Sequence, residues 1–233
     1  MFVTIPLYSL HGVPAQARLI LAVAITLVIM PLMPDFQAIE MFSYQGFMVG
    51  VAQVMIGLTS GFILQLAFSA VLFAGQGVAL GMGLGFASMV DPQNGQQVPV
   101  VAQFYVFTCT LIFLSLDGHL VLIKMLLDSF TSLPIGIDGI TKANIWTIIG
   151  WSSRMFAGGF LLTMPIVVSL LLVNISFGVA TRAAPQLNIF SVGFPITLML
   201  GLVLIWLTLP DVLEQFADML TGAYDLVGQM LRL

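Results

Sequence analysis

The chain has 233 residues, of which 60% are hydrophobic and 7% are charged, and its mean hydropathy is +1.12. Soluble globular domains carry about 25% charged residues, so this composition excludes that class and indicates an integral membrane protein. The net charge of −4 is small, and it points neither to nucleic acid nor to an anionic membrane surface as the partner.

The N-terminal half begins with an apolar segment from Leu19 to Met33, which is short for a membrane crossing. The stretch between Glu40 and Asp91 is uncharged and has room for two spans of about 20 residues each. An unpaired amide in hydrocarbon is costly, so the polar residues of this stretch are expected to face other helices rather than lipid. They are Gln53, Gln65, Ser69 and Gln76.

Five glycines lie within eleven residues near the end of that stretch: Gly75, Gly77, Gly81, Gly83 and Gly85. Three of them repeat every four residues, which would place them on one helix face that another backbone can approach closely. The glycine density also lowers helix propensity and favours irregular backbone, which membranes tolerate only inside protein or around a polar cavity. Two interpretations therefore stay open, a packing seam that runs into a turn and a non-helical element inside an assembly.

Three apolar segments follow, and the most polar part of the chain, Asp117 to Asn144, separates the first two. A proline inside a helix blocks the backbone bond one turn back, so we expect kinks at Pro165 and Pro195. The segments are Val98–Leu116, Trp146–Phe177 and Ile189–Leu209.

The tail, Pro210 to Leu233, is predicted to be a separate amphipathic helix. Thr208 and Asp211 have the spacing of a capping box, and Pro210 falls in the first turn. The polar face of this helix is acidic, whereas helices that lie on membranes are usually basic. Docking on protein and lying on lipid both stay open, and our hypothesis is that the tail packs on a neighbouring subunit.

The sequence contains no signature of a catalytic site. The glycines do not have G-x-G-x-x-G spacing, and neither a Walker sequence nor G-x-S-x-G nor H-E-x-x-H is present. His11 and His119 are far apart, which argues against a metal site. No enzyme activity and no cofactor are expected. Arg154 lies close to an apolar span, where it either faces a bundle interior or extends to the membrane interface.

Three segments, in this order, carry a family resemblance: GFASMVDPQNG (85–95), LDGHLVLIKMLLDSFTSLPIG (116–136) and MPIVVSLLLVNISFGVATRAAPQLNIFSVGFPITLMLG (164–201). They closely resemble the FliR/SctT family, the R component of the flagellar and virulence type III export gate. The resemblance implies an all-α membrane protein of helical hairpins with Gly/Pro-interrupted hydrophobic helices, part of a helical multi-subunit gate. Family members usually carry a further N-terminal hydrophobic helix, and this chain starts near where that helix would end.

The resemblance implies a core subunit that helps to form and close the channel through which unfolded proteins cross the bacterial inner membrane, in a flagellar basal body or an injectisome. The implied partners are FliP-like, FliQ-like and FlhB-like subunits, the exported proteins and the lipid bilayer, with no nucleic acid. We expect one domain over residues 1–233 with about five or six hydrophobic segments. A polytopic secondary transporter of a small solute remains the alternative, because it would also show Gly/Pro-interrupted spans and an intramembrane arginine.

The resemblance also assigns candidate sites. The loop 85–97 corresponds to the plug that crosses the export pore in the family, with Phe86, Met89 and Val90 as its apolar stoppers. The candidate plug residues are Gly85, Phe86, Ala87, Ser88, Met89, Val90, Asp91, Pro92, Gln93, Asn94 and Gly95. The candidate subunit-interface residues are Gly77, Gly81, Arg154, Asn174, Arg182, Pro185 and Gln186.

Overall fold

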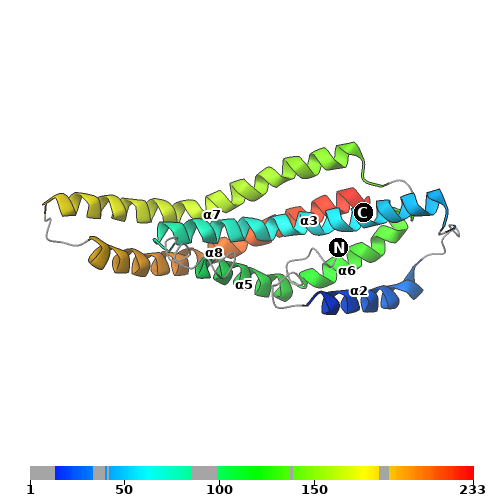
Figure 1. Ribbon diagram of the computed structural model, residues 1–233, viewed down its shortest axis with the longest axis horizontal. Helices are drawn as coiled ribbons and strands as arrows, with labels where there is room; N and C mark the ends of the chain where they lie inside the picture. Colours follow the sequence, from blue (N-terminus) through cyan, green and yellow to red (C-terminus); the bar gives the residue numbers. More distant parts are fainter. Residues whose placement is uncertain (1–13, 34–39, 41, 85–98, 137–138, 184–188) are drawn as a thin grey trace. The chain divides into compact units, whose positions relative to one another are not determined.

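The computed structural model describes residues 14–33, 40, 42–84, 99–136, 139–183 and 189–233, and every regular element in these ranges is a helix (Figure 1). The predicted all-α fold is confirmed. The elements are α2 (Ala15–Ile29), the short 3₁₀ helix η1 (Met30–Leu32), α3 (Tyr44–Gly81), α5 (Val100–Ser115), α6 (Gly118–Ser132), α7 (Lys142–Ala183) and α8 (Ile189–Leu231).

Three of these helices, α3, α7 and α8, are long and apolar enough to cross a membrane. The pair α5 and α6, bent by 61°, makes a fourth candidate span if it is counted as one. Asp117 stands at this bend with a left-handed backbone (φ 53°). Most of the described part of the uncharged stretch that had room for two spans forms a single 38-residue helix, α3, because neither a proline nor a charge interrupts it.

The predicted helix break before the tail is wrong. α8 is continuous from Ile189 to Leu231 and runs through both Pro195 and Pro210. The hydroxyl of Thr208 donates to the carbonyl of Leu204 at 2.9 Å, one turn back, so it does not act as a cap. Proline removes one backbone hydrogen bond, and a helix can continue past that loss when tertiary packing holds both sides.

Contacts within the chain divide it into two compact units. The first comprises residues 1–67, 113–153 and 219–233, and it includes the C-terminal end of α8. In this unit the hydroxyl of Tyr224 donates to the carbonyl of Gly118 at 3.1 Å. The hydroxyl of Ser132 donates to the carbonyl of Leu231 at 2.7 Å. These bonds join the start and the end of α6 to the last turns of α8.

The apolar side chains at the C-terminal end of α8 therefore pack against other helices of the same chain. Seven apolar side chains of the last turns of α8 are buried, whereas Asp225 and Gln229 are exposed. Gly222 lies near the indole of Trp151 on α7, and Gly228 lies near Met125 on α6. The expectation that this stripe docks on a neighbouring subunit is wrong, because its own chain already covers it. The buried residues are Met219, Leu220, Ala223, Leu226, Val227, Met230 and Leu231.

The second unit comprises residues 68–112 and 154–218, and its core is a glycine seam. A Cβ at Gly75 would overlap the Cα of Ala102 on α5, and a Cβ at Gly77 would lie 2.6 Å from a methyl group of Thr163 on α7. A Cβ at Gly159 would lie 2.7 Å from the carbonyl oxygen of Ala70 on α3. Glycine is required at these positions because the helices approach backbone to backbone.

The hydroxyl of Thr163 completes this seam. It donates to the carbonyl of Gly159 at 2.7 Å and lies 3.3 Å from the carbonyl oxygen of Ala74 on α3. Elsewhere in the same unit the rings of Phe68 and Phe216 meet edge to face, with centroids 5.0 Å apart. Of the two interpretations of the glycine-rich stretch, the packing seam therefore holds for residues 75–81.

We predict that Gly75→Ala destabilises the chain by about 1–3 kcal/mol, because the added methyl group forces α3 and α5 apart. Gly150→Ala is the matched control, since nothing lies within 4 Å of its Cβ position. Alanine is the better helix former, so this control should be neutral or stabilising by up to about 1 kcal/mol. Unfolding of the detergent-solubilised chain by SDS measures both. Equal stability of the two variants would contradict the seam.

Candidate functional site

A single exposed stripe runs along α3. From Phe47 to Phe62 its apolar members are spaced three or four residues apart, and Phe73 and Leu80 follow eleven and seven residues later on the same face of the helix. The stripe begins at Phe47 (65% exposed) and ends at Leu80 (66% exposed), a distance of about 50 Å at 1.5 Å per residue. Its large apolar members are Phe47, Val51, Val54, Leu58, Phe62, Phe73 and Leu80.

Polar side chains interrupt this stripe in its C-terminal half. Gln65 is exposed, and Ser69 and Gln76, one and three turns further on, are half-buried. The sequence predicted that these residues face other helices. Gln65 is exposed, so the helix that it was expected to face is not found among the described residues.

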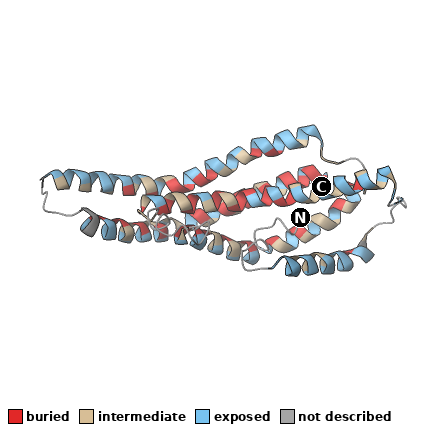
Figure 2. Ribbon diagram, viewed as in Figure 1, coloured by how far each residue is buried: buried red, intermediate tan, exposed pale blue. Residues whose placement is uncertain are grey.

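The helix α7 carries both charged candidates for a subunit interface, Arg154 and Arg182. Arg154 is exposed twelve residues after Lys142, or about 18 Å from the start of the helix, with Ser152 and Ser153 before it and Met155 and Phe156 after it. The C-terminal part of α7 is also open to its surroundings: none of residues 171–182 is buried (Figure 2). Asn174 and Arg182, both predicted interface residues, are exposed in this part.

The two glycine candidates for a subunit interface lie on α3, on the side that faces α7. Gly77 faces Thr163, and Gly81 faces Val167 and Leu170, so both contact α7 of the same chain. This packing is sufficient to explain glycine at position 77, whereas a methyl group at position 81 would need only a small shift of the Leu170 side chain. Their role in a subunit interface remains a prediction, and the candidates Pro185 and Gln186 lie outside the described residues.

The helix α3 ends just before the residues that are predicted to form the plug. Gly83 has a left-handed backbone (φ 80°), and its N–H donates to the carbonyl of Leu80 at 3.0 Å. The N–H of Leu84 donates to the carbonyl of Ala79 at 2.9 Å. This pair of bonds is a Schellman motif, which stops a helix at a glycine. All candidate plug residues, 85–95, lie outside the described residues.

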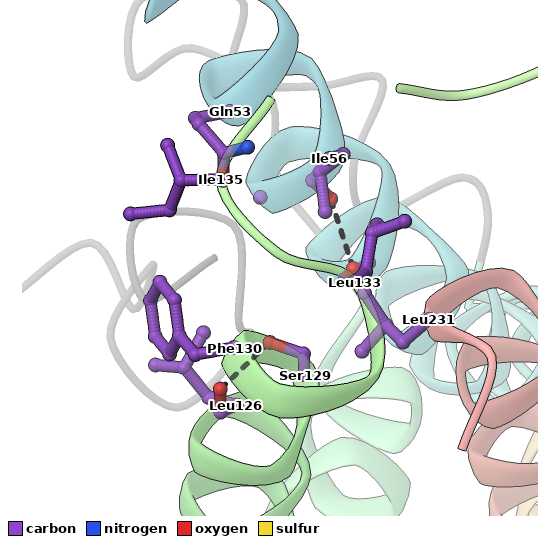
Figure 3. Close-up of a pocket in the computed structure, with 10 residues that line it drawn as sticks. Gln53, Ile56, Leu126, Ser129, Phe130, Leu133, Ile135 and Leu231 are labelled. Atoms are coloured by element: carbon purple, nitrogen blue, oxygen red, sulfur yellow. Dashed lines mark hydrogen bonds between the residues drawn. The ribbon is translucent and has the colours of Figure 1, made fainter. Parts of the chain in front are cut away.

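Sequence reasoning missed two features. A cavity of about 340 Å³ lies between α3, α6 and the end of α8 (Figure 3). Two buried polar atoms of described residues, His119 Nδ1 and Trp151 Nε1, have no hydrogen-bond partner. The only available signal for the cavity was the helical spacing of Gly57 and Ser60, which the long apolar run obscured.

Within the described residues, no group of three or more His, Cys, Asp or Glu side chains could hold a metal ion. The features that these residues do present are apolar helix faces with isolated polar groups. Such an arrangement binds lipid and other helices. The fold and the site together define an integral membrane protein with surfaces that its own chain leaves uncovered.

Comparison with known proteins identifies the family. Residues 1–223 match the model of bacterial export proteins, family 1. Relatives named flagellar biosynthetic protein FliR occur in Pectobacterium carotovorum (38% identical over 98% of this chain and 87% of the relative) and Escherichia coli K12 (35% identical, with the same coverage). The Aquifex aeolicus relative of that name is 32% identical over 89% of this chain and 80% of its own length.

The chain belongs to this FliR family of bacterial export proteins. It is a membrane-embedded subunit of the flagellar or type III protein export gate. The alternative, a secondary transporter of a small solute, receives no support from these comparisons.

Proposed function

We propose that the chain is a core subunit that helps to build and to close the protein channel of the gate in the bacterial inner membrane. It assembles with FliP-like and FliQ-like subunits and associates with an FlhB-like subunit. Unfolded flagellar or secreted proteins pass through the channel, and the role of this chain is structural rather than catalytic. The family match and the exposed stripe of α3 support the proposal.

The length of that stripe is the observation that carries the proposal. The hydrocarbon core of a bilayer is about 30 Å thick, and a helix tilted by about 40° follows a path of about 39 Å through it. The exposed apolar residues of this face extend from Phe47 to Leu80, about 50 Å, with polar residues among them in the C-terminal half. Lipid cannot cover all of it at any usual tilt, so protein has to cover the remainder.

The polar residues on exposed faces support the same conclusion. An amide or a guanidinium that faces hydrocarbon carries a desolvation cost, and membrane proteins reduce it by pairing these groups with other protein groups. Gln65, Arg154 and Asn174 are exposed on long apolar helices. We therefore assign them to contacts with neighbouring subunits of the gate.

The loop 85–97 serves as the closure in this proposal. It follows the Schellman motif at Gly83, where α3 stops. Phe86, Met89 and Val90 supply apolar bulk, and hydrophobic constrictions close pores by excluding water. The closed state is favoured by only a few kcal/mol, so that a passing substrate can displace the loop.

Arg154→Ala should lower the amount of assembled gate at least tenfold, since losing one partner of a desolvated charge pair costs about 2–5 kcal/mol. Arg154→Lys should rescue assembly only in part, because lysine lacks the planar fork of donors. Lys142→Ala, a charge removal at the exposed first residue of the same helix, is the control. The readout is co-purification with the FliP-like subunit. Full assembly of both Arg154 variants would show that this side chain reaches the membrane interface instead.

Replacing Phe86, Met89 and Val90 with glycine should make cells that express the whole gate permeable to small ions while the gate still assembles. Conductance and growth are measured beside the wild type. The matched control replaces three exposed apolar residues of α3, Val51, Val54 and Leu58, with alanine. That control should weaken assembly without opening an assembled pore. A glycine variant that assembles and remains as tight as the wild type would refute the plug.

A further inference from the structure

The C-terminal end of α3, with the turn that follows it, is buried, although helix ends usually fray. Val78 and Ala79 are fully buried, and Met82 is 1% exposed. The Schellman motif at Gly83 closes this end of the helix. A helix end that is both capped and buried has a fixed position in the compact unit to which it belongs.

The helix α8 makes the closest contacts with this end of α3. A Cβ at Gly201 would lie 2.5 Å from Cγ and 2.8 Å from Sδ of Met82. The missing side chain of Gly201 is thus a notch in α8, and the side chain of Met82 fills it. A Cβ at Gly83 would lie 3.4 Å from Cδ2 of Phe194, which is seven residues before Gly201. The end of α3 therefore meets α8 at two points about 10 Å apart along that helix.

The helix α7 also contacts this end of α3. A Cβ at Gly81 would lie 3.3 Å from Cδ1 of Leu170 and 3.4 Å from Cγ2 of Val167. Three consecutive residues, 81–83, are thus in contact with α7 and α8. We call this arrangement the α3 clamp. It comprises Gly81, Met82, Gly83, Val167, Leu170, Phe194 and Gly201.

The α3 clamp lies at the start of the loop 85–97, which begins two residues after Gly83. After the loop, α5 begins at Val100 and is fixed as well, because Ala102 packs backbone to backbone on Gly75. The chain is therefore anchored on both sides of the loop within one compact unit. An apolar constriction excludes water only while its side chains fill the pore, and a gap of about 2.8 Å, the diameter of a water molecule, is enough to wet it.

We propose that the α3 clamp positions the loop 85–97 in the channel, with Met82 and Gly201 as the positioning residues. This proposal rests on the proposed closure of the channel by that loop. The α3 clamp does not block the channel itself. It fixes the point from which the loop starts, so that the apolar side chains of the loop reach the pore in one position.

Gly201→Ala tests the α3 clamp from α8. The added methyl group overlaps Cγ of Met82, and ordinary contact at about 3.5–4.0 Å requires a displacement of about 1 Å or more. Met82→Ala tests the same contact from the side of α3 by emptying the notch. Each variant should raise the ion conductance per assembled gate at least fivefold in cells that express the whole gate. Met82→Leu, which nearly conserves volume, should stay as tight as the wild type.

Gly159→Ala is the matched control. Its methyl group would also overlap a neighbour, the carbonyl oxygen of Ala70 at 2.7 Å, but Ala70 lies twelve residues before Met82, or about 18 Å along α3. This variant should unfold in less SDS than the wild type, as a packing defect does, without a rise in conductance per gate. The two readouts thus separate the positioning of the loop from a general loss of stability.

The conductances also separate the α3 clamp from the closure on which it rests. If gates with Gly201→Ala and with Met82→Ala stay as tight as the wild type while the glycine variant of Phe86, Met89 and Val90 leaks, the closure stands and the α3 clamp is wrong. If Gly159→Ala leaks as much as Gly201→Ala, any packing defect opens the gate and the α3 clamp is also wrong. A tight glycine variant would refute the closure, and the α3 clamp with it.

Discussion

The structure depends on a mismatch between the length of its apolar helices and the thickness of a bilayer. α3, α7 and α8 have 38, 42 and 43 residues, about twice the length of about 20 residues that a membrane requires. Only 22–28% of the most apolar part of each candidate span is buried inside the chain. Such a chain reaches a low free energy only when lipid and other proteins together cover it, which is the condition of a subunit in a membrane-embedded gate.

Small residues hold the chain together and so leave its large apolar side chains for outside partners. In the glycine seam, Gly75, Gly77 and Gly159 let helices meet backbone to backbone, and the hydroxyl of Thr163 bonds across the contact. Close approach gives strong packing over a narrow strip. The rest of the helix circumference, including the stripe of α3, stays free. Gly57 and Ser60 are also small, and the space that they leave unfilled is part of the cavity.

The sequence predicted the class, the all-α fold and the family, because a low charge content, long apolar runs and the three family-like segments are strong signals. It did not predict the continuous α8, since the capping-box spacing at Thr208 and the proline at 210 are local signals, and tertiary packing overrode them. Nor did it predict which faces are covered: the stripe of the tail and that of α3 are both apolar, but only the first is buried by its own chain. Spacing identifies a face, whereas its partner depends on the folded chain.

Residue-specific labelling in detergent tests most directly whether other subunits complete the surface of this chain. Gln65→Cys places a thiol on the exposed stripe, and the native Cys109 is buried. Maleimide labelling of this thiol is compared between the isolated chain and the chain co-purified with FliP-like and FliQ-like subunits, in the same detergent. Our account predicts rapid labelling of the isolated chain and at least tenfold slower labelling in the assembled gate. Equal rates in the two would contradict it.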